Sequence, residues 1–252
     1  MNLCIIQARM GSTRLPNKVL MSAKDNMTML EYEIKRVQLA KKIHKIVIAT
    51  TDMPGDDQIQ ELCTKIGVDC FRGSEDDVLE RYAKCAEKYP GYENIIRLTG
   101  DCPLIDPAEI DKTIGYFEAN DLDFASNCEA NNETLPDGMD TEIFSRKALE
   151  QAARDAKLKS EREHVTLYIR NSPDFRKGYV KANEDFSHFR LTLDEQADHE
   201  VIKFVIENTD LNDGYLKFIS VLTKNPEVME KNIKIKRNQG LVKSLSTDGI
   251  VQ

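Results

Sequence analysis

The sequence predicts an α/β protein built on a mostly parallel sheet, and three observations support this prediction. Short apolar runs alternate with segments whose apolar residues recur at helical spacing, which is typical of βαβ units. The apolar runs are nearly continuous, as expected of strands buried on both faces. The chain has 252 residues, of which 40% are hydrophobic and 31% are charged. It can therefore bury a sizeable core without needing disulfides or metals.

Strands and helices alternate through the first half of the chain. The five expected strands lie at residues 3–6, 46–49, 68–71, 95–98 and 122–125. Each of the four helices expected between them has an apolar face with residues three or four positions apart. These faces are Leu30, Ile34 and Val37; Ile59, Leu62 and Ile66; Val78, Tyr82 and Cys85; and Ile110, Ile114 and Phe117.

The pattern changes after about residue 126, where residues 127–138 are polar and predict a loop. The elements expected next are a strand at 141–144, a helix at 145–156, a Ser160-x-x-Glu163 capping box that opens another helix, and strands at 179–182 and 189–193. Two helices are expected after that: one that turns Val201, Ile202, Val205 and Ile206 inward, and a last one that spans 214–224. The basic stretch 231–237 is interpreted as a solvated face or a contact with a partner subunit. The simplest architecture is a single domain, 1–252, with an insertion near 130–190.

Composition excludes several classes of protein. Thirty-five Lys and Arg against 43 Asp and Glu give a net charge of −8, which argues against a nucleic-acid-coating protein, because phosphate backbones require clustered cations. No run approaches the ~18 apolar residues of a membrane span, and no signal peptide is visible. The six cysteines are scattered without a Cys-x-x-Cys pair, which indicates reduced thiols. We therefore expect a cytoplasmic protein with no nucleic-acid or membrane partner.

The loop after the first expected strand has the composition of an anion site. It holds three cations (Arg9, Arg14 and Lys18), a glycine (Gly11) and two hydroxyl side chains. Glycine lets the backbone approach an anion closely, and Arg and Lys can neutralise a polyphosphate. The loop is neither a Walker A nor a Gly-x-Gly-x-x-Gly motif. Taken alone, it is equally compatible with a surface loop of solvated charges.

Two aspartates follow expected strands and face the same edge of the sheet. Asp101 comes after the strand at 95–98, and Asp194 directly after 189–193. Ligands of open parallel sheets bind beyond the carboxyl ends of the strands. Carboxylates suit Mg²⁺, which binds one or two of them together with substrate phosphates. Each aspartate alone is also explained as a turn or helix-capping residue, but the pair opposite a cationic loop predicts a metal–triphosphate site.

The chain resembles the cytidylyltransferases that activate acidic sugars, the CMP-KDO and CMP-sialic acid synthetases, and within them most closely the spore-coat polysaccharide biosynthesis (SpsF) group. The resemblance covers most of the chain. Its most specific parts are the opening segment Gln7–Leu20 and the two aspartates. It extends to Ala49–Asp52, Asp77–Tyr82, Leu98–Ile105, Asp137–Glu142, Arg162–Thr166 and Arg190–Asp194.

This resemblance implies a Rossmann-like three-layer α/β/α nucleotidyltransferase fold with an inserted dimerisation element, and a homodimer. It also implies roles for particular residues. Those expected to bind the nucleotide are Ala8, Arg9, Gly11, Ser12, Arg14, Lys18 and Asp101, to which Arg72 is added because it follows a strand. Those expected to take part in catalysis are Arg9, Lys18 and Asp101, and Asp101 and Asp194 are expected to bind Mg²⁺. Those expected at the acceptor are Asp137, Asp140, Glu142, Arg162 and His164.

The function implied is transfer of CMP from CTP to an acidic keto-sugar, with release of pyrophosphate, in surface polysaccharide or glycan biosynthesis. Two departures from the relatives concern the acceptor. The opening loop has Gly11-Ser12-Thr13-Arg14 where the sialic acid enzymes have Gly-Ser-Lys-Gly, and the segment at 100–103 has Cys102 where the KDO enzymes have Glu. Two alternatives therefore stay open. One is a transferase of the same fold with a phosphate or phosphonate acceptor, and the other is a non-catalytic nucleotide-binding subunit.

Overall fold

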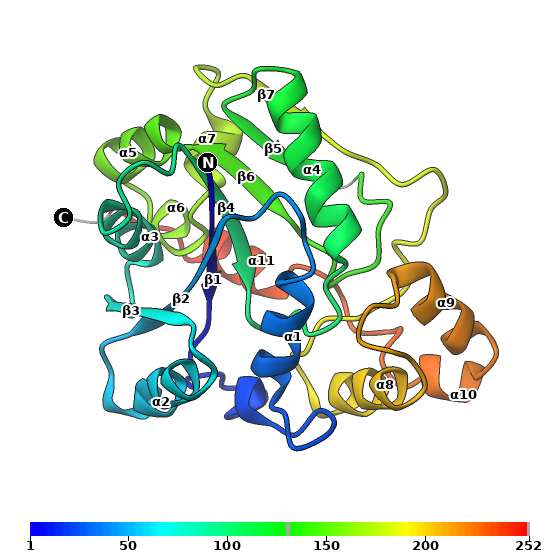
Figure 1. Cartoon of the computed structure of the whole chain (residues 1–252). Coiled ribbons are helices and arrows are strands. Elements are labelled where there is room, and N and C mark those ends of the chain that lie inside the picture. Colours follow the sequence, from blue (N-terminus) through cyan, green and yellow to red (C-terminus); the bar gives the residue numbers. More distant parts are fainter. Residues whose placement is uncertain (130–131, 251–252) are drawn as a thin grey trace.

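The computed structural model describes residues 1–129 and 132–250. Its centre is a seven-stranded sheet in the order β3-β2-β1-β4-β6-β5-β7 (Figure 1). The strands are β1 (Asn2–Gln7), β2 (Lys45–Thr51), β3 (Asp69–Gly73), β4 (Asn94–Thr99), β5 (Phe124–Ser126), β6 (Glu142–Ser145) and β7 (Lys177–Tyr179). Neighbouring strands are parallel except that β6 runs antiparallel to β4 and β5. The mostly parallel sheet that the alternation predicted is confirmed.

Helices cover both faces of the sheet and give three layers. Side chains alternate along β1, so Cys4 and Ile6 pack with α1, α2 and α4, while Leu3 and Ile5 pack with α3, α5 and α7. All four of these side chains are fully buried. The helices are α1 (Met29–Val37), α2 (Asp57–Ile66), α3 (Val78–Glu87), α4 (Pro107–Ala119), α5 (Arg146–Asp155), α6 (Lys159–Glu163) and α7 (Leu167–Asn171).

A third apolar cluster lies beside the carboxyl edge of the sheet. It is built on α8 (Gln196–Glu207) and α9 (Tyr215–Thr223), with α10 (Pro226–Met229) next in the chain. The predicted inward face of α8 is confirmed, because all four of its apolar residues are fully buried. Arg36 of α1 is also fully buried and donates hydrogen bonds to the carbonyls of Ile105, Leu211 and Asp213. These bonds fix the cluster against the three-layer body.

Two expected strands of the second half differ from the structure. The strand expected at 179–182 is β7, which ends at Tyr179. Residues 189–193 are extended, but they make only a single bridge, between Arg190 and Asp137. Their alternating apolar side chains are buried in the third cluster, and the backbone of this segment bonds to loops on both sides instead of to strands. Apolar alternation therefore predicted the burial of this segment correctly but its secondary structure wrongly.

The expected capping box is also wrong. Helix α6 starts at Lys159, so Ser160 lies inside the first turn instead of capping it. The carboxylate of Glu161 accepts the Leu158 amide, and Asp248 accepts both the amide and the hydroxyl of Ser160. Two helices, α10 and α11 (Gln239–Ser246), follow the helix that was expected to be the last. The longer of them is α11. It buries none of its residues, although its apolar residues recur at helical spacing.

The region 130–190 contributes β6, β7 and helices α5 to α7 to the same sheet and layers (Figure 1). Its interpretation as an inserted dimerisation element stays a prediction. Among the helices of the described ranges, none is both long and apolar enough to span a lipid bilayer. All six cysteines are free thiols, and four of them are buried, as expected of a chain with reduced cysteines.

Candidate active site

The site begins where β1 and β4 end side by side. Gln7 and Thr99 are paired at the carboxyl ends of these strands, so the loops that follow leave the sheet together. The amide of Gly100 donates to the Gln7 carbonyl over 2.8 Å. A Cβ at residue 100 would lie 3.0 Å from Cβ of Ala8. Glycine therefore lets the two strand ends approach closely, so that the two loops start from neighbouring points at the carboxyl edge of the sheet.

The loop after β1 is held rigidly at both ends. Near its start, the Met10 amide donates to the carboxylate of buried Asp56 over 2.7 Å. Asp56 ends the short helix η2 (Pro54–Asp56) after β2. At its end, Asn17 adopts a left-handed conformation (φ 60°) and Lys18 opens the short helix η1 (Lys18–Leu20). The turn aims the Lys18 side chain back beneath the loop, where it is 9% exposed.

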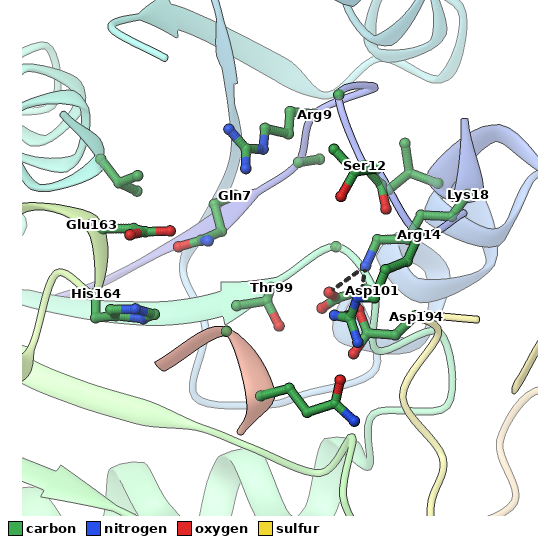
Figure 2. Close-up of a pocket in the computed structure, with 18 of the residues that line it drawn as sticks. Gln7, Arg9, Ser12, Arg14, Lys18, Thr99, Asp101, Glu163, His164 and Asp194 are labelled. Carbon is green, nitrogen blue, oxygen red and sulfur yellow. Dashed lines mark hydrogen bonds and ion pairs between the residues drawn. The ribbon is translucent and has the colours of Figure 1, made fainter. Parts of the chain in front are cut away.

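Lys18 joins the two predicted carboxylates, and this is the central feature of the site (Figure 2). Its ammonium nitrogen lies 2.7 Å from Oδ2 of Asp101 and 2.9 Å from Oδ1 of Asp194. The extended segment before Asp194 is fastened to the Asp101 loop, because the Leu193 amide donates to the Asp101 carbonyl over 2.8 Å. Residues 93 positions apart in the chain thus meet at one point, as the paired-aspartate prediction required.

The charges of this cluster support one another. Burial opposes ionisation of Asp101, but the Lys18 charge and its hydrogen bond outweigh this and lower the Asp101 pKa to about 2. Burial likewise opposes the charge of Lys18, yet the two carboxylates raise the Lys18 pKa. At neutral pH the site therefore holds an ammonium between two carboxylates. Within residues 1–129 and 132–250, no cluster of three or more His, Cys, Asp or Glu has metal-binding geometry.

Two arginines also pair with Asp194, one at each carboxylate oxygen. Arg14, from the loop after β1, places a guanidinium nitrogen 2.9 Å from Oδ1 of Asp194. Arg190 is almost fully buried and bonds Asp194 at 3.2 Å, Asp137 at 2.7 Å and Asp198 at 2.8 Å. Asp198 in turn accepts the amides of residues 194 and 195, which lead into α8. Asp194 is consequently fixed by side chains and is not the cap of that helix.

Two adjoining cavities meet at this cluster. The larger, about 490 Å³, is bounded by the loop after β1 together with Lys18, Asp101 and Asp194. We call it the nucleotide cavity, after the role expected of these residues from the sequence. The smaller, about 260 Å³, is also lined by Asp101 and Asp194. We call it the acceptor cavity, because it contains most of the residues expected at the acceptor. These names are used below for the two cavities. Residues shared by both walls are Arg14, Arg97, Thr99, Asp101, His164, Asp194, Gln239 and Gly240.

Most of the residues predicted from the sequence line one of these cavities. Those at the nucleotide cavity are Ala8, Arg9, Gly11, Ser12, Arg14, Lys18 and Asp101, and those at the acceptor cavity include Asp137, Asp140, Glu142 and His164. Arg9 also makes a long ion pair with Glu75, at 3.5 Å. Burial lowers the pKa of His164, whose Nε2 lies 3.0 Å from the Ser244 hydroxyl.

Two of the residues predicted at the site, Arg72 and Arg162, bind partners away from the two cavities. The Arg72 guanidinium bonds Asp57 and Gln60 of α2 and the carbonyl of Met53. Arg162 forms a forked pair with Asp77, at 2.6 to 3.0 Å. Neither side chain lines the two cavities. Both arginines therefore link neighbouring elements of the fold through hydrogen bonds.

Several residues of the site were missed from the sequence. Arg97 lies in the middle of β4, reaches both cavities and pairs with Glu142 at 2.6 Å; a charge inside an apolar strand is the signal that could have revealed it. Arg81 of α3 lines the nucleotide cavity and is 2% exposed. Arg170 lines the acceptor cavity. Arg237, in the stretch interpreted as solvated, is mostly buried and pairs with Asp137 and Asp140.

A parallel sheet with a cationic loop and a carboxylate pair at its carboxyl edge defines a nucleotidyltransferase. The chain belongs to the cytidylyltransferase family, whose model matches residues 3–238. It is 38% identical to the spore coat polysaccharide biosynthesis protein SpsF of Bacillus subtilis, over 89% of this chain and 95% of that protein. It is 28% identical to a 3-deoxy-manno-octulosonate cytidylyltransferase of Geobacter sulfurreducens, over 67% and 61% of the two chains.

Solved structures agree with this assignment. A cytidylyltransferase from Leptospira borgpetersenii superposes with a TM-score of 0.85 at 37% identity, over 90% of this chain and 96% of that one. A CMP:2-keto-3-deoxy-manno-octonic acid synthetase in complex with CTP superposes with a TM-score of 0.61 at 16% identity, over 82% and 98%. The second comparison bears on the fold alone. The Rossmann-like nucleotidyltransferase fold and the membership of the family are both confirmed.

Proposed function

We propose that this protein transfers CMP from CTP to an acidic sugar and releases pyrophosphate, as a step of surface polysaccharide or glycan biosynthesis. The single observation that carries the proposal is the meeting of Lys18, Asp101 and Asp194 beneath a glycine-containing cationic loop, at the junction of two cavities. One cavity has the size and the cations for a nucleoside triphosphate. The other holds the groups expected at an acceptor.

In the proposed reaction, an acceptor hydroxyl oxygen attacks the α-phosphorus of CTP. A new P–O bond forms, the bond between the α-phosphorus and the bridging oxygen breaks, and pyrophosphate leaves with that electron pair. The hydroxyl proton passes to a base or to solvent. Arg9, Arg14 and Lys18 hold the triphosphate and the charge that develops on the departing pyrophosphate. No covalent enzyme intermediate is needed.

The residues present fit the Mg²⁺ that we propose as cofactor. Asp101 and Asp194 each lie within 2.9 Å of one cationic nitrogen, so both already share a single positive charge. Two carboxylates are the usual protein share of a Mg²⁺ site, the remaining ligands being phosphate oxygens and water. When bound there, Mg²⁺ would neutralise phosphate charge and lower the pKa of the acceptor hydroxyl.

An anionic acceptor is supported by Arg170. It lines the acceptor cavity, and within residues 1–129 and 132–250 no carboxylate lies within ion-pair distance of its guanidinium. By contrast, Arg14, Arg97 and Arg190 at the same cavity each have a carboxylate within 2.9 Å. Arg170 is thus free to bind an acidic group. A homodimer and a cytoplasmic location are also part of this proposal.

Arg170→Ala should raise the acceptor KM by about 10- to 100-fold, the loss expected for one hydrogen bond to a charged group. The KM for CTP should stay within a factor of two or so, because Arg170 does not line the nucleotide cavity. Pyrophosphate release with 3-deoxy-manno-octulosonate or N-acetylneuraminate as acceptor measures both constants. Arg154→Ala, which removes an exposed arginine of α5, is the matched control. Equal changes in both KM values would contradict this role.

Arg14→Ala should weaken CTP binding by about tenfold or more, because a guanidinium fork at the triphosphate is lost. The effect on acceptor binding should be smaller. Calorimetric titration with CTP and Mg²⁺ measures the change. A CTP affinity equal to that of the wild type would show that the loop does not hold the nucleotide.

The proposal as a whole is tested by a screen of pyrophosphate release. The purified protein is incubated with each of the four nucleoside triphosphates, crossed with acidic sugars and with phosphorylated acceptors. We expect release with CTP and an acidic sugar. Release only with a phosphate or phosphonate acceptor would replace the acceptor class, and no release with any pair would contradict the proposed activity.

A further inference from the structure

The last part of the chain crosses both cavities. We call residues 236–250 the C-terminal strap. It passes the acceptor cavity, forms α11 and ends against α6, far from α10, the helix that precedes it in the chain (Figure 1). Gln239 and Gly240 line both cavities, and Lys243 lines the nucleotide cavity. The family model ends at residue 238, so α11 and the segment after it lie beyond the part that defines the family.

The strap is fastened at its start by one arginine. Arg237 pairs with Asp140 and, at 3.5 Å, with Asp137, both of which line the acceptor cavity. It also donates to the Leu135 carbonyl over 3.2 Å. A guanidinium nitrogen of Arg237 lies 3.4 Å from the sulfur of Cys128. This arginine and the chain around it therefore cover Cys128 and the acidic end of the acceptor cavity.

A polar latch fastens the strap at its far end. The Ser244 hydroxyl lies 3.0 Å from Nε2 of His164 and donates to Glu163 over 2.7 Å. Asp248 accepts the amide and the hydroxyl of Ser160, at 3.0 and 2.7 Å. The Gly249 carbonyl accepts the amide of Lys159. The latch thus joins the strap to α6 and directly to a side chain that lines both cavities.

Almost no apolar burial supports this attachment. Val242 is 65% exposed, Leu245 50% and Ile250 74%. A segment held by a few surface hydrogen bonds, with little apolar contact, belongs to the parts of a fold that open most easily. The part of the strap from α11 onward is therefore a wall of the site that opens more easily than the sheet beneath it.

We propose that the C-terminal strap is a part of the acceptor site that determines specificity: it closes over the acceptor and must open for the acceptor to enter. The identity of the acceptor in this inference rests on the proposed function. That the strap covers the acceptor cavity does not. The strap brings Lys236, which has no ion pair in the described part of the chain, to the acceptor cavity, together with Asn238 and Gln239. A cation and two amides suit the carboxylate and hydroxyls of an acidic sugar.

The cover is tested by the reactivity of Cys128, without any nucleotide. In a Cys70→Ser background, which removes the other partly exposed thiol, a chain that ends at Ile235 and the double variant Ser244→Ala/Asp248→Asn are labelled with a small thiol reagent. We expect labelling of Cys128 to rise by about tenfold or more in the shortened chain and by a few-fold in the double variant. The double variant keeps the test decisive if the shortened chain does not fold. Labelling at the rate of the parent in every folded chain would overturn the proposal.

The specificity role is tested by the kinetics of the double variant. Opening the latch should raise the acceptor KM by about fivefold or more while the KM for CTP changes by less than about twofold. Val242→Ser, an exposed change on the same helix, is the control and should alter neither constant. Equal shifts of the two KM values, or none, would overturn the specificity role. If the wild type turns over no acceptor, the proposed function fails, whereas the labelling result still decides whether the strap covers the cavity.

Discussion

Asp101→Asn should lower the rate of pyrophosphate release by about 10³-fold or more while leaving the fold intact. The carboxylate lies at the junction of the two cavities, 2.7 Å from the Lys18 ammonium. Asparagine keeps the size and a carbonyl oxygen but removes the charge that a divalent ion needs. Preorganised charge at the reacting phosphate is the kind of contribution whose loss costs about 10²–10³ in rate for a single donor. Loss of a metal ligand should exceed this.

Asp52→Asn is the matched control for this prediction. Asp52 also follows a parallel strand, β2, but it is exposed and lines neither cavity. We expect it to leave the rate unchanged. Circular dichroism and the melting temperature confirm that both variants fold. Full activity of Asp101→Asn with CTP and its acceptor would remove Asp101 from the chemistry.

Lys18→Met should lower the thermal stability of the protein in the absence of metal. Asp101 would lose its only ion-pair partner in the described residues, and Asp194 would retain only its arginines. Breaking a buried pair costs about 3–5 kcal/mol. Since the Asp101 side chain is 26% exposed, we expect about 1–3 kcal/mol, or a fall in melting temperature of about 2–10 °C.

Mg²⁺ should reverse part of this loss. With the ammonium gone, the two carboxylates face each other without a shared cation, and a divalent ion would replace it. Added Mg²⁺ should therefore raise the melting temperature of Lys18→Met more than that of the wild type. The melting temperatures of the two proteins should be compared at pH 7, which is well above the Asp101 pKa of about 2. At that pH the carboxylate is charged and the ion pair contributes fully. Below that pKa the contribution disappears.

The control for Lys18→Met is Lys84→Met, which breaks an exposed pair with Glu80 within α3. Such exposed pairs contribute little to stability because solvent screens them, so its melting temperature should hardly change. Equal Mg²⁺ responses of Lys18→Met and wild type would show that the carboxylates do not form a metal site.

The sequence predicts those parts of the fold that apolar periodicity controls. The strand run Leu3–Ile6 and the apolar faces of α1 to α4 and α8 are buried as expected, except that Ile66 of α2 is only partly buried. Each of these segments must hide a continuous apolar surface. Predictions failed where polar contacts decide. The extended segment before Asp194 is bonded to loops, and α11 leaves its apolar residues unburied and is held mainly by polar contacts.

The residues of the candidate site also fall into those that the sequence could place and those that it could not. Residues that directly follow β1 and β4 could be placed in advance, because parallel strands present their carboxyl ends at one edge. Arg72 was expected to follow a strand, but it lies within β3, and its long side chain folds back onto α2. Arg170 lines the acceptor cavity, and Arg237 pairs with two of its acidic residues, Asp137 and Asp140, although both arginines are distant in the chain from those aspartates. Their position depends on how α7 and the C-terminal strap pack, which local sequence does not encode.

The most direct test of the central claim is calorimetric titration of CTP into the wild type and Asp194→Asn, each with Mg²⁺ and with a chelator. If the cationic loop and the carboxylate pair form a metal–triphosphate site, the wild type should bind CTP markedly more tightly with Mg²⁺, and Asp194→Asn should lose that gain while still folding. Identical affinities with and without Mg²⁺ in the wild type, or an undiminished Mg²⁺ effect in the variant, would contradict the account.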